Sequence, residues 1–258
     1  MTYIKVRNVS KQFVRRGQLT QALSDIDLDI DEGSFVSFIG PSGCGKSTLL
    51  RIIGGLADID GGDISIGDRT PSEMQAAKQF GFVPQAPALF PWRTVLENMK
   101  LPFEVNRRNK LNVKDQEPHL IELLKSVGLG DFQHSYPKEL SGGMKQRVGI
   151  ARAFATDAPI LLMDEPFSAL DEITRELLML QLMKIWELHK KTVIFVTHSL
   201  QEAVYLSDKV VVMTSRPGKI STIIDIGLPR KRDESIIGTE DFLHYVSKVR
   251  HALRERWE

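Results

Sequence analysis

The sequence predicts an α/β protein in which helices cover both faces of a central β-sheet. The first indication is a glycine-rich loop at 40–48, which follows a strand-like stretch and precedes a helix-like one. The second is a pair of continuous apolar runs at 160–163 and 193–196, which are typical of buried parallel strands. The third is an amphipathic helix over 173–189, between these two runs. Strands and helices that alternate in this way predict an α/β sheet.

Composition limits the size of the protein and the partners it can have. A chain of 258 residues can bury a full core, and we expect one compact unit with a subdomain. The formal net charge is +1, so no overall basic field draws the chain to nucleic acid. The single cysteine, Cys44, excludes an internal disulfide and a cysteine-based zinc site. Because no apolar run is long enough to span a bilayer and residues 1–10 lack a signal-peptide core, we expect a cytosolic or peripheral protein.

The N-terminal residues predict an antiparallel flap of two strands. Apolar residues alternate over 4–13, which we expect to form an edge strand that turns at 15–17. A second strand over 22–30 alternates apolar residues with aspartates. Phe13, at the end of the first strand, could stack on a purine ring, although an aromatic side chain in that place more often belongs to the core.

The glycine-rich loop at 40–48, GPSGCGKST, matches a phosphate-binding loop at every fixed position. Gly43 and Gly45 allow turns that point successive backbone N–H groups into one concavity, and the helix that begins near Lys46 adds the positive end of its dipole. Such a cavity fits a triphosphate, with Lys46 reaching the β- and γ-phosphates and the Ser47 hydroxyl binding Mg²⁺. The predicted phosphate-binding residues are Gly40, Pro41, Ser42, Gly43, Cys44, Gly45, Lys46, Ser47 and Thr48.

The segment after the loop predicts the next core elements and then an insertion. The core elements are expected at 48–53 (helix), 64–66 (strand), 71–78 (helix) and 80–85 (strand), the last ending at Gln85. From residue 86 the composition changes, because prolines such as Pro102 separate short segments with helical periodicity. We therefore expect an inserted helical region at 86–157. It ends in the octet LSGGMKQR at 140–147, which leads into a helix.

Polar residues end the two apolar runs. Asp164 and Glu165 directly follow the first run, as acids do where a buried parallel strand ends at a site. The strand that contains the second run is expected to end at His198, and a histidine at the end of a strand is more often structural than catalytic. The helix between the runs is expected to bury Leu177, Leu178, Leu180, Leu182, Met183 and Trp186.

The C-terminal segment predicts the edge of the sheet and a closing helix. A short helix is expected at 201–206, with strands at 210–213 and 220–226. Residues 229–233 form a charged linker. The closing helix has an apolar stripe made of Phe242, Val246, Val249, Leu253 and Trp257.

The chain resembles the nucleotide-binding subunit of ABC transporters over essentially its whole length. The residues that carry the resemblance are, in order, the loop at 40–48, Gln85, the octet at 140–147, Asp164 and Glu165, the tetrapeptide SALD at 168–171, and His198. The octet matches the signature motif of that family. The resemblance implies an α/β P-loop NTPase of the ABC cassette type, with a mixed central sheet, an antiparallel β flap and an inserted helical subdomain. The implied parts are a core at 1–85 and 158–227, the helical subdomain at 86–157, and a linker and helix at 228–258.

The resemblance also implies a role for each polar residue. Asp164 holds Mg²⁺, and Glu165 orients and deprotonates the attacking water. Gln85 is a Mg²⁺ and water ligand that moves with the helical region. His198 contacts the γ-phosphate, although Ser199 stands where many relatives have an aspartate after this histidine.

In this family two chains pack head to tail around two ATP molecules, so the resemblance implies a second copy as partner. Ser141, Gly142 and Gly143 precede a helix and offer N–H groups and a helix dipole to the phosphate of the other copy. Asp171 contacts the partner across the interface, and Phe13 serves as the platform for the adenine ring.

Within the family, the chain resembles importers of nitrate, sulfonates and taurine. The residues that indicate this branch are LFPWRTVLEN at 89–98, Leu101 with Pro102, and LPRKRD at 228–233. The resemblance implies an ATP- and Mg²⁺-dependent ATPase subunit, peripheral on the cytoplasmic face of the inner membrane. Its partners are transmembrane permease subunits and, indirectly, a solute-binding protein, with no nucleic acid. In this family those partners determine the solute, so the cassette sequence does not identify it.

Two functions from other classes compete with this interpretation. The first is a soluble ABC ATPase that acts on nucleic acid or ribosomes, but such proteins usually carry two cassettes or a long coiled coil between loop and signature. The second is a kinase with the same loop, which has no use for the octet at 140–147. The sequence favours the transporter subunit because it has a single cassette, no heptad pattern in that interval, and the octet.

Two further expectations concern individual segments. Cys44 lies near a helix N-terminus, where a thiolate is favoured, so we expect a maleimide to inactivate the ATPase and Mg-ATP to protect it. Residues 86–99 carry Leu89, Phe90 and Trp92 among prolines. These apolar side chains either contact a permease subunit or anchor the helical region to the core.

Overall fold

A mixed six-stranded sheet forms the centre of the part of the chain that this computed structural model describes, residues 2–15, 17–106, 113–215 and 217–254. The strands lie in the order β5 (Phe80–Val83), β6 (Ile160–Asp164), β7 (Thr192–Val196), β3 (Phe35–Ile39), β8 (Lys209–Met213) and β9 (Ile220–Asp225). Neighbouring strands are parallel, except that β8 and β9 are antiparallel. The predicted mixed α/β sheet is therefore confirmed.

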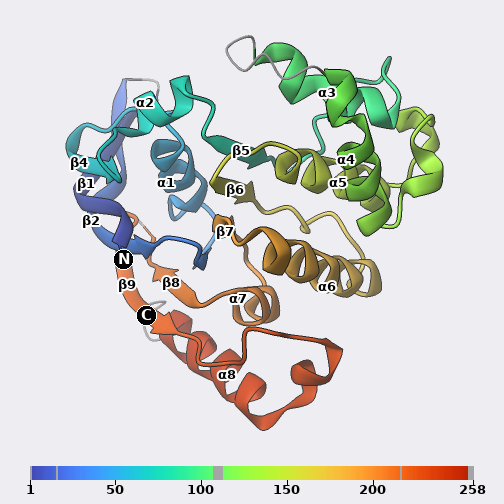
Figure 1. Cartoon of the computed structure of the whole chain (residues 1–258). Helices are drawn as coiled ribbons and strands as arrows, with labels where there is room; N and C mark the ends of the chain where they lie inside the picture. Colours follow the sequence, from blue (N-terminus) through green and yellow to red (C-terminus); the bar gives the residue numbers. More distant parts are fainter. Residues whose placement is uncertain (1, 16, 107–112, 216, 255–258) are drawn as a thin grey trace.

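Alternate residues of the central strands point into two separate cores, as the period of a β-strand requires. On β3, Val36 and Phe38 pack with the flap and with helix α1 (Lys46–Ile53), whereas Phe35 and Ile39 pack with helices on the other face. Those helices are α5 (Gly142–Phe154), α6 (Glu172–His189), α7 (Leu200–Leu206) and α8 (Glu240–Arg254). Figure 1 shows how these layers enclose the sheet. Because β3, β6 and β7 are parallel, the residues that follow them meet at one edge.

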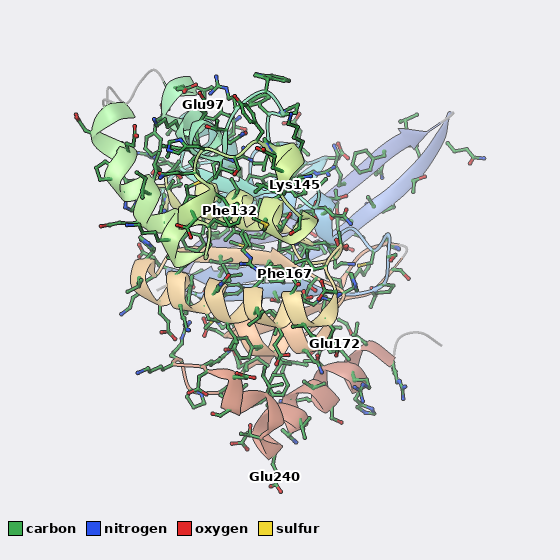
Figure 2. All side chains as sticks on the ribbon, turned by 90° about the vertical axis from the view of Figure 1, so that its right-hand side faces the viewer. Glu97, Phe132, Lys145, Phe167, Glu172 and Glu240 are labelled. Carbon is green, nitrogen blue, oxygen red and sulfur yellow. The ribbon has the colours of Figure 1, made fainter. Side chains whose placement is uncertain are left out.

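The flap is an antiparallel sheet in the order β2 (Gln18–Asp31), β1 (Thr2–Arg15) and β4 (Gly61–Ile66). The prediction that β1 is an edge strand is wrong, because β4 pairs with its second side, with Ile4 opposite Ile66. Ile4 and Val6 of β1, which lies between β2 and β4, are fully buried. The hairpin of β1 and β2 extends beyond the rest of the molecule (Figure 2).

The helical region contains α3 (Val95–Val105), α4 (Val113–Ser126), α5 and the short 3₁₀ helices Gly130–Phe132 and Pro137–Glu139. Thr94 and Glu97 form a capping box that fixes the start of α3. The expectation that Pro102 separates segments is wrong, because α3 continues through it to Val105. Pro102 has no N–H to donate to the Asn98 carbonyl, so the helix loses one hydrogen bond without ending.

The inner face of α6 differs from the predicted stripe. Leu177 is 49% exposed, although the sequence assigned it to the core. The buried residues are Leu178, Met179, Leu182, Met183, Ile185 and Trp186. Apolar residues lie all around this part of the helix, so periodicity alone does not decide which of them faces the sheet.

The C-terminal segment is held more firmly than a charged linker would be. Arg232 is buried, and its guanidinium donates to the carbonyl oxygens of Val204, Tyr205 and Ser207 at the end of α7. Burial lowers the pKa of Arg232 to about 10. Phe242, Val246 and Val249 then pack α8 against the core, as predicted, whereas Trp257 lies outside the described residues. In Figure 1 α8 and the helical region lie at opposite ends of the core.

Two further helices complete the described fold. Helix α2 (Pro71–Ala76) begins at the predicted proline and is capped by Thr70 and Glu73. A 3₁₀ helix at Glu234–Gly238 precedes α8. Among the described residues, no helix is both long and apolar enough to cross a membrane.

Candidate functional site

The glycine-rich loop joins the end of β3 to the start of α1, as the sequence predicts. Gly43 and Gly45 have φ values of 78° and 96°, which a residue with a Cβ rarely adopts. A Cβ on Gly45 would lie 2.6 Å from a methyl carbon of Leu23, and one on Gly40 would lie 2.6 Å from the Met213 carbonyl oxygen. The loop can therefore take this shape only with glycine at these positions.

Lys46 lies inside the loop and is only 5% exposed. Its Nζ donates to the carbonyl oxygens of Gly40 at 2.9 Å and Pro41 at 3.0 Å. Among the residues that the structure describes, no carboxylate lies within ion-pairing distance of this ammonium. A buried cation without an opposite charge beside it attracts an anion. The cradle thus fits the phosphate group that the sequence predicts.

The environment of Cys44 contradicts the prediction that its thiol is reactive. The side chain is fully buried beneath the loop. Burial raises the pKa of the Cys44 thiol, and the nearby Lys46 ammonium offsets only part of this effect. The expected stabilisation of a thiolate by the helix N-terminus is therefore outweighed by the loss of solvation.

We now expect Cys44 to resist a maleimide in the native protein. The thiol is both inaccessible and protonated, so modification should require the loop to open, and activity should persist during brief exposure to the reagent. Mass spectrometry of the adduct in native and denatured protein measures this difference. Rapid labelling of the native chain with loss of ATPase activity would contradict the buried position.

Gly218 is a loop-supporting residue that the sequence analysis missed. Its N–H donates to Ala22 and its carbonyl accepts from Ser24, both at 3.0 Å, so it joins the flap to the segment after β8. A Cβ at this position would lie 2.1 Å from the Cys44 carbonyl oxygen, so only glycine fits against the underside of the loop. The proline–glycine pair at 217–218 is a turn signal, but it does not indicate a contact with a distant loop.

Ser47 and Asp164 meet at the mouth of the loop. The Ser47 hydroxyl donates to Asp164 Oδ1 at 2.6 Å, although the two residues are 117 positions apart. Asp164 is the buried last residue of β6, and the Arg51 guanidinium lies 3.8 Å from its other carboxylate oxygen. Arg51 was not predicted as a site residue. Hydroxyl and carboxylate oxygens are hard ligands of the kind that Mg²⁺ prefers, so this pair fits the predicted metal.

Glu165 is held beside this pair by an unusual backbone conformation. Its φ is 47°, in the left-handed region, and its N–H donates to the Val196 carbonyl of β7 at 2.9 Å. The turn brings Glu165 Oε2 to 3.5 Å from His198 Nδ1 and 3.4 Å from Gln85 Nε2. The Gln85 amide is also 3.3 Å from the Ser168 hydroxyl. Three predicted catalytic residues from three separate segments are therefore brought together.

The predicted signature residues are placed at the start of α5. Ser141 is the N-cap and accepts from the Met144 N–H at 3.2 Å, so the helix already begins within the octet, at Gly142. Asp171 caps α6 in the same way, accepting from Thr174 at 2.9 Å. Lys145 and Glu172, which are labelled in Figure 2, lie in the first turns of α5 and α6.

The signature and Asp171 are not joined to the phosphate loop of the same chain. Within the described part of the chain, no hydrogen bond or ion pair links Ser141, Gly142, Gly143 or Asp171 to residues 40–48. Phe13 is 46% exposed on the flap, and the alternative that it belongs to the core is wrong. The Lys11 ammonium lies 5.5 Å from the centre of the Phe13 ring.

Comparison with known proteins gives one matching family model and many relatives. The model described as "ABC transporter" matches residues 23–168. An uncharacterised ABC transporter ATP-binding protein of Methanocaldococcus jannaschii is 45% identical, over 98% of this chain and 91% of that protein. An aliphatic sulfonates import ATP-binding protein of Bacillus cereus is 44% identical, over 95% of this chain and 94% of that protein.

Solved structures are similar over most of the fold. A bacterial ABC transporter cassette solved as a dimer matches with a TM-score of 0.76 and 36% identity, over 88% of this chain and 100% of that one. A dimeric post-hydrolysis state of an ATP-binding cassette, bound to ADP and phosphate, matches with a TM-score of 0.75 and 35% identity, over the same shares.

Proposed function

The chain belongs to the ABC transporter family as an ATP-binding ATPase subunit, and on that premise we propose that it energises a membrane importer of a small organic anion of the sulfonate type. The observation that carries the proposal is the convergence of Gln85, Glu165 and His198 beside the Ser47–Asp164 pair. The solute class rests on the relatives named for sulfonate import. Direct comparison of sulfonate, taurine and nitrate uptake by the assembled transporter tests it.

We assign the binding of the nucleotide phosphates to the loop and the Lys46 ammonium. The backbone N–H groups of the loop and the N-terminus of α1 favour an anion at this place. Ser47, Asp164 and Gln85 would hold Mg²⁺, whose positive charge neutralises the charge that develops on the phosphate oxygens. Phe13 offers an exposed ring for the adenine base.

The hydrolytic step is assigned to Glu165, Gln85 and His198. Glu165 accepts the proton of the attacking water, and Gln85 orients that water through its amide. His198 donates to the transferred phosphate. These roles are supported by the close approach of all three side chains at one edge of the sheet.

A second copy of the chain completes each site in this proposal. Ser141, Gly142 and Gly143 would bind the phosphate held by the partner copy, and Asp171 would contact the partner at the interface. The support is that Ser141, Gly142 and Asp171 are exposed at helix starts, whereas Gly143 is buried in the first turn of α5. Among the described residues none of the four is linked to its own phosphate loop, and similar cassettes were solved as dimers.

The surface formed by Phe90 and Trp92 is proposed to bind the permease subunits, which would hold the protein peripherally at the cytoplasmic face of the membrane. Trp92 is 69% exposed and its ring centre lies 4.9 Å from that of Phe90. The buried Asn98 amide fixes the backbone beneath them by donating to the carbonyls of Phe90, Arg93 and Thr94. Side chains that are exposed on a firmly held loop suit a partner better than an anchoring role in the core.

Replacing Trp92 with aspartate should abolish assembly with the permease and solute uptake while leaving basal ATP hydrolysis unchanged. A central aromatic residue of an interface contributes about 2 kcal/mol or more, so affinity should fall by roughly 30-fold or more. Co-purification, uptake and hydrolysis by the isolated subunit are the measurements.

Leu188→Asp is the matched control, because Leu188 is also a highly exposed apolar residue and lies at the far end of α6. It should assemble normally. If Trp92→Asp unfolds the subunit, or if it assembles like the control, the surface does not bind the permease. Recovery of the chain with nucleic acid or ribosomes instead of membrane proteins would favour the soluble ABC ATPase.

A further inference from the structure

Glu202 is a buried acid that the mechanism above does not use. It lies in the first turn of α7 and is only 4% exposed. One carboxylate oxygen accepts from the Thr197 hydroxyl, and the other lies 3.5 Å from Arg175 Nε. Burial raises the pKa of Glu202, while the Thr197 hydrogen bond and the Arg175 charge act in the opposite direction. A buried carboxylate is costly unless it is paired and hydrogen-bonded, so Glu202 depends on both Thr197 and Arg175.

The Thr197 side of Glu202 shapes the turn that carries His198. The Ser199 N–H donates to the Thr197 hydroxyl at 2.9 Å, and the Glu202 N–H donates to the Ser199 hydroxyl at 3.3 Å. His198 lies between Thr197 and Ser199 in the chain, and its side chain is exposed at the turn. The three interactions therefore fix the backbone that presents the imidazole.

The Arg175 side of Glu202 reaches the turn that carries Asp171. Arg175 donates through its guanidinium to the Leu170 carbonyl at 2.8 Å and through its backbone N–H to the Asp171 carbonyl at 2.9 Å. Asp171 caps α6 from the same turn. Arg175 consequently holds the segment that immediately precedes the helix.

We propose that Glu202 and Arg175 form a positioning pair that fixes the His198 turn relative to the Asp171 turn. The inference rests on the proposed function, in which His198 acts on the nucleotide of its own chain and Asp171 contacts the partner copy. The pair would make the alignment of His198 depend on the approach of the second copy.

The position of the pair favours this role over a contribution to stability alone. Both ends of the pair contact turns that carry candidate functional residues, and a network of this kind behaves as one unit in a poorly solvated place. Asp208 offers the contrast. It is mostly buried, accepts from the Phe35 N–H at 2.8 Å and pairs with Arg230, but its contacts lie at the start of β3 and in the C-terminal segment.

Glu202→Gln, Arg175→Gln and the double variant test the pair in the full-length chain. Each single change should lower kcat for ATP by about 10–100-fold, the size expected when a catalytic group is slightly misplaced. The KM for ATP should stay unchanged, because the phosphate loop is untouched. The double variant should be no slower than either single variant, since both remove the same link.

Asp208→Asn is the matched control for removing a buried carboxylate. It should lower the melting temperature and leave kcat per folded chain unchanged. If Glu202→Gln behaves like this control, or if the effects of the two single changes on kcat multiply in the double variant, the pair is only structural. If Glu202→Gln does not fold, Thr197→Val removes the two hydrogen bonds that the Thr197 hydroxyl makes with Glu202 and Ser199, and it should lower kcat at constant KM. An unchanged kcat would overturn the inference.

Failure of the pair is distinguishable from failure of the proposed function. His198→Ala, measured in parallel, should reduce turnover whether or not the pair has a positioning role. If this variant loses turnover while the pair variants do not, only the positioning inference fails. If it hydrolyses ATP at the wild-type rate, the assigned site itself is wrong.

Discussion

Replacing Glu165 with glutamine is expected to lower ATP turnover by about 10²–10⁴-fold, the usual contribution of a general base. The amide has the same shape as the carboxylate but cannot accept the proton of the attacking water. ATP affinity should remain, because Lys46 and the loop that we propose to bind the phosphates are unchanged. Steady-state release of phosphate and equilibrium binding of ATP measure the two effects separately.

The same variant should also accumulate as a dimer when Mg-ATP is added. Two chains that close around ATP without hydrolysing it lose the step that separates them, so size-exclusion chromatography should show the larger species. Glu240→Gln is the control, since Glu240 begins α8 far from the site (Figure 2) and should hydrolyse ATP normally. Turnover near the wild-type rate in Glu165→Gln would reject Glu165 as the base.

Local chemistry explains why much of the fold was predictable. The loop at 40–48 depends on glycines with positive φ and on the helix that follows, and both requirements lie within one short segment. The buried strands β6 and β7 are continuous apolar runs, which leave few alternatives.

Features that depend on distant partners could not be predicted. The central position of β1 is set by its pairing with β4, and the inner face of α6 is set by the sheet beneath it. Cys44 illustrates the same limit, because its loop suggests a reactive thiolate while residues from elsewhere in the fold bury it. Arg232 appears in a charged linker in the sequence, yet the three carbonyl groups that its Nη1 donates to lie 25–28 positions earlier in the chain.

In the candidate site, too, some residues could be predicted from the sequence and others could not. The end of a buried apolar run indicated Asp164 and Glu165 as candidates, and resemblance to a family added Gln85 and a catalytic role for His198. The fold brings Gln85, Glu165 and His198 into contact. The supporting residues had no local signal. Nothing in the sequence indicates that Glu202, in the short helix α7, pairs with Arg175, in the first turn of α6. Contacts of this kind arise from the packing of α6 against α7 and need the structure.

Replacing Lys46 with alanine should weaken ATP binding by roughly 10–100-fold, because a hydrogen bond to a charged group contributes about 1.5–3 kcal/mol. The ammonium donates to the carbonyls of Gly40 and Pro41 and to the Cys44 sulfur, and no described carboxylate pairs with it, so a phosphate oxygen would provide an opposite charge. Titration with a fluorescent ATP analogue measures the affinity directly.

The combination of Lys46→Ala with Glu165→Gln separates binding from hydrolysis. The single Glu165→Gln variant should form the ATP-dependent dimer, and the double variant should not, because the phosphates that join the two copies are no longer held. Lys209→Ala is the matched control, since Lys209 is a partly buried lysine paired with Asp31 at the start of β8, away from the loop. It should bind ATP like the wild type. Unchanged ATP affinity in Lys46→Ala would mean that the buried ammonium stabilises the loop through Gly40 and Pro41 and does not bind the phosphates.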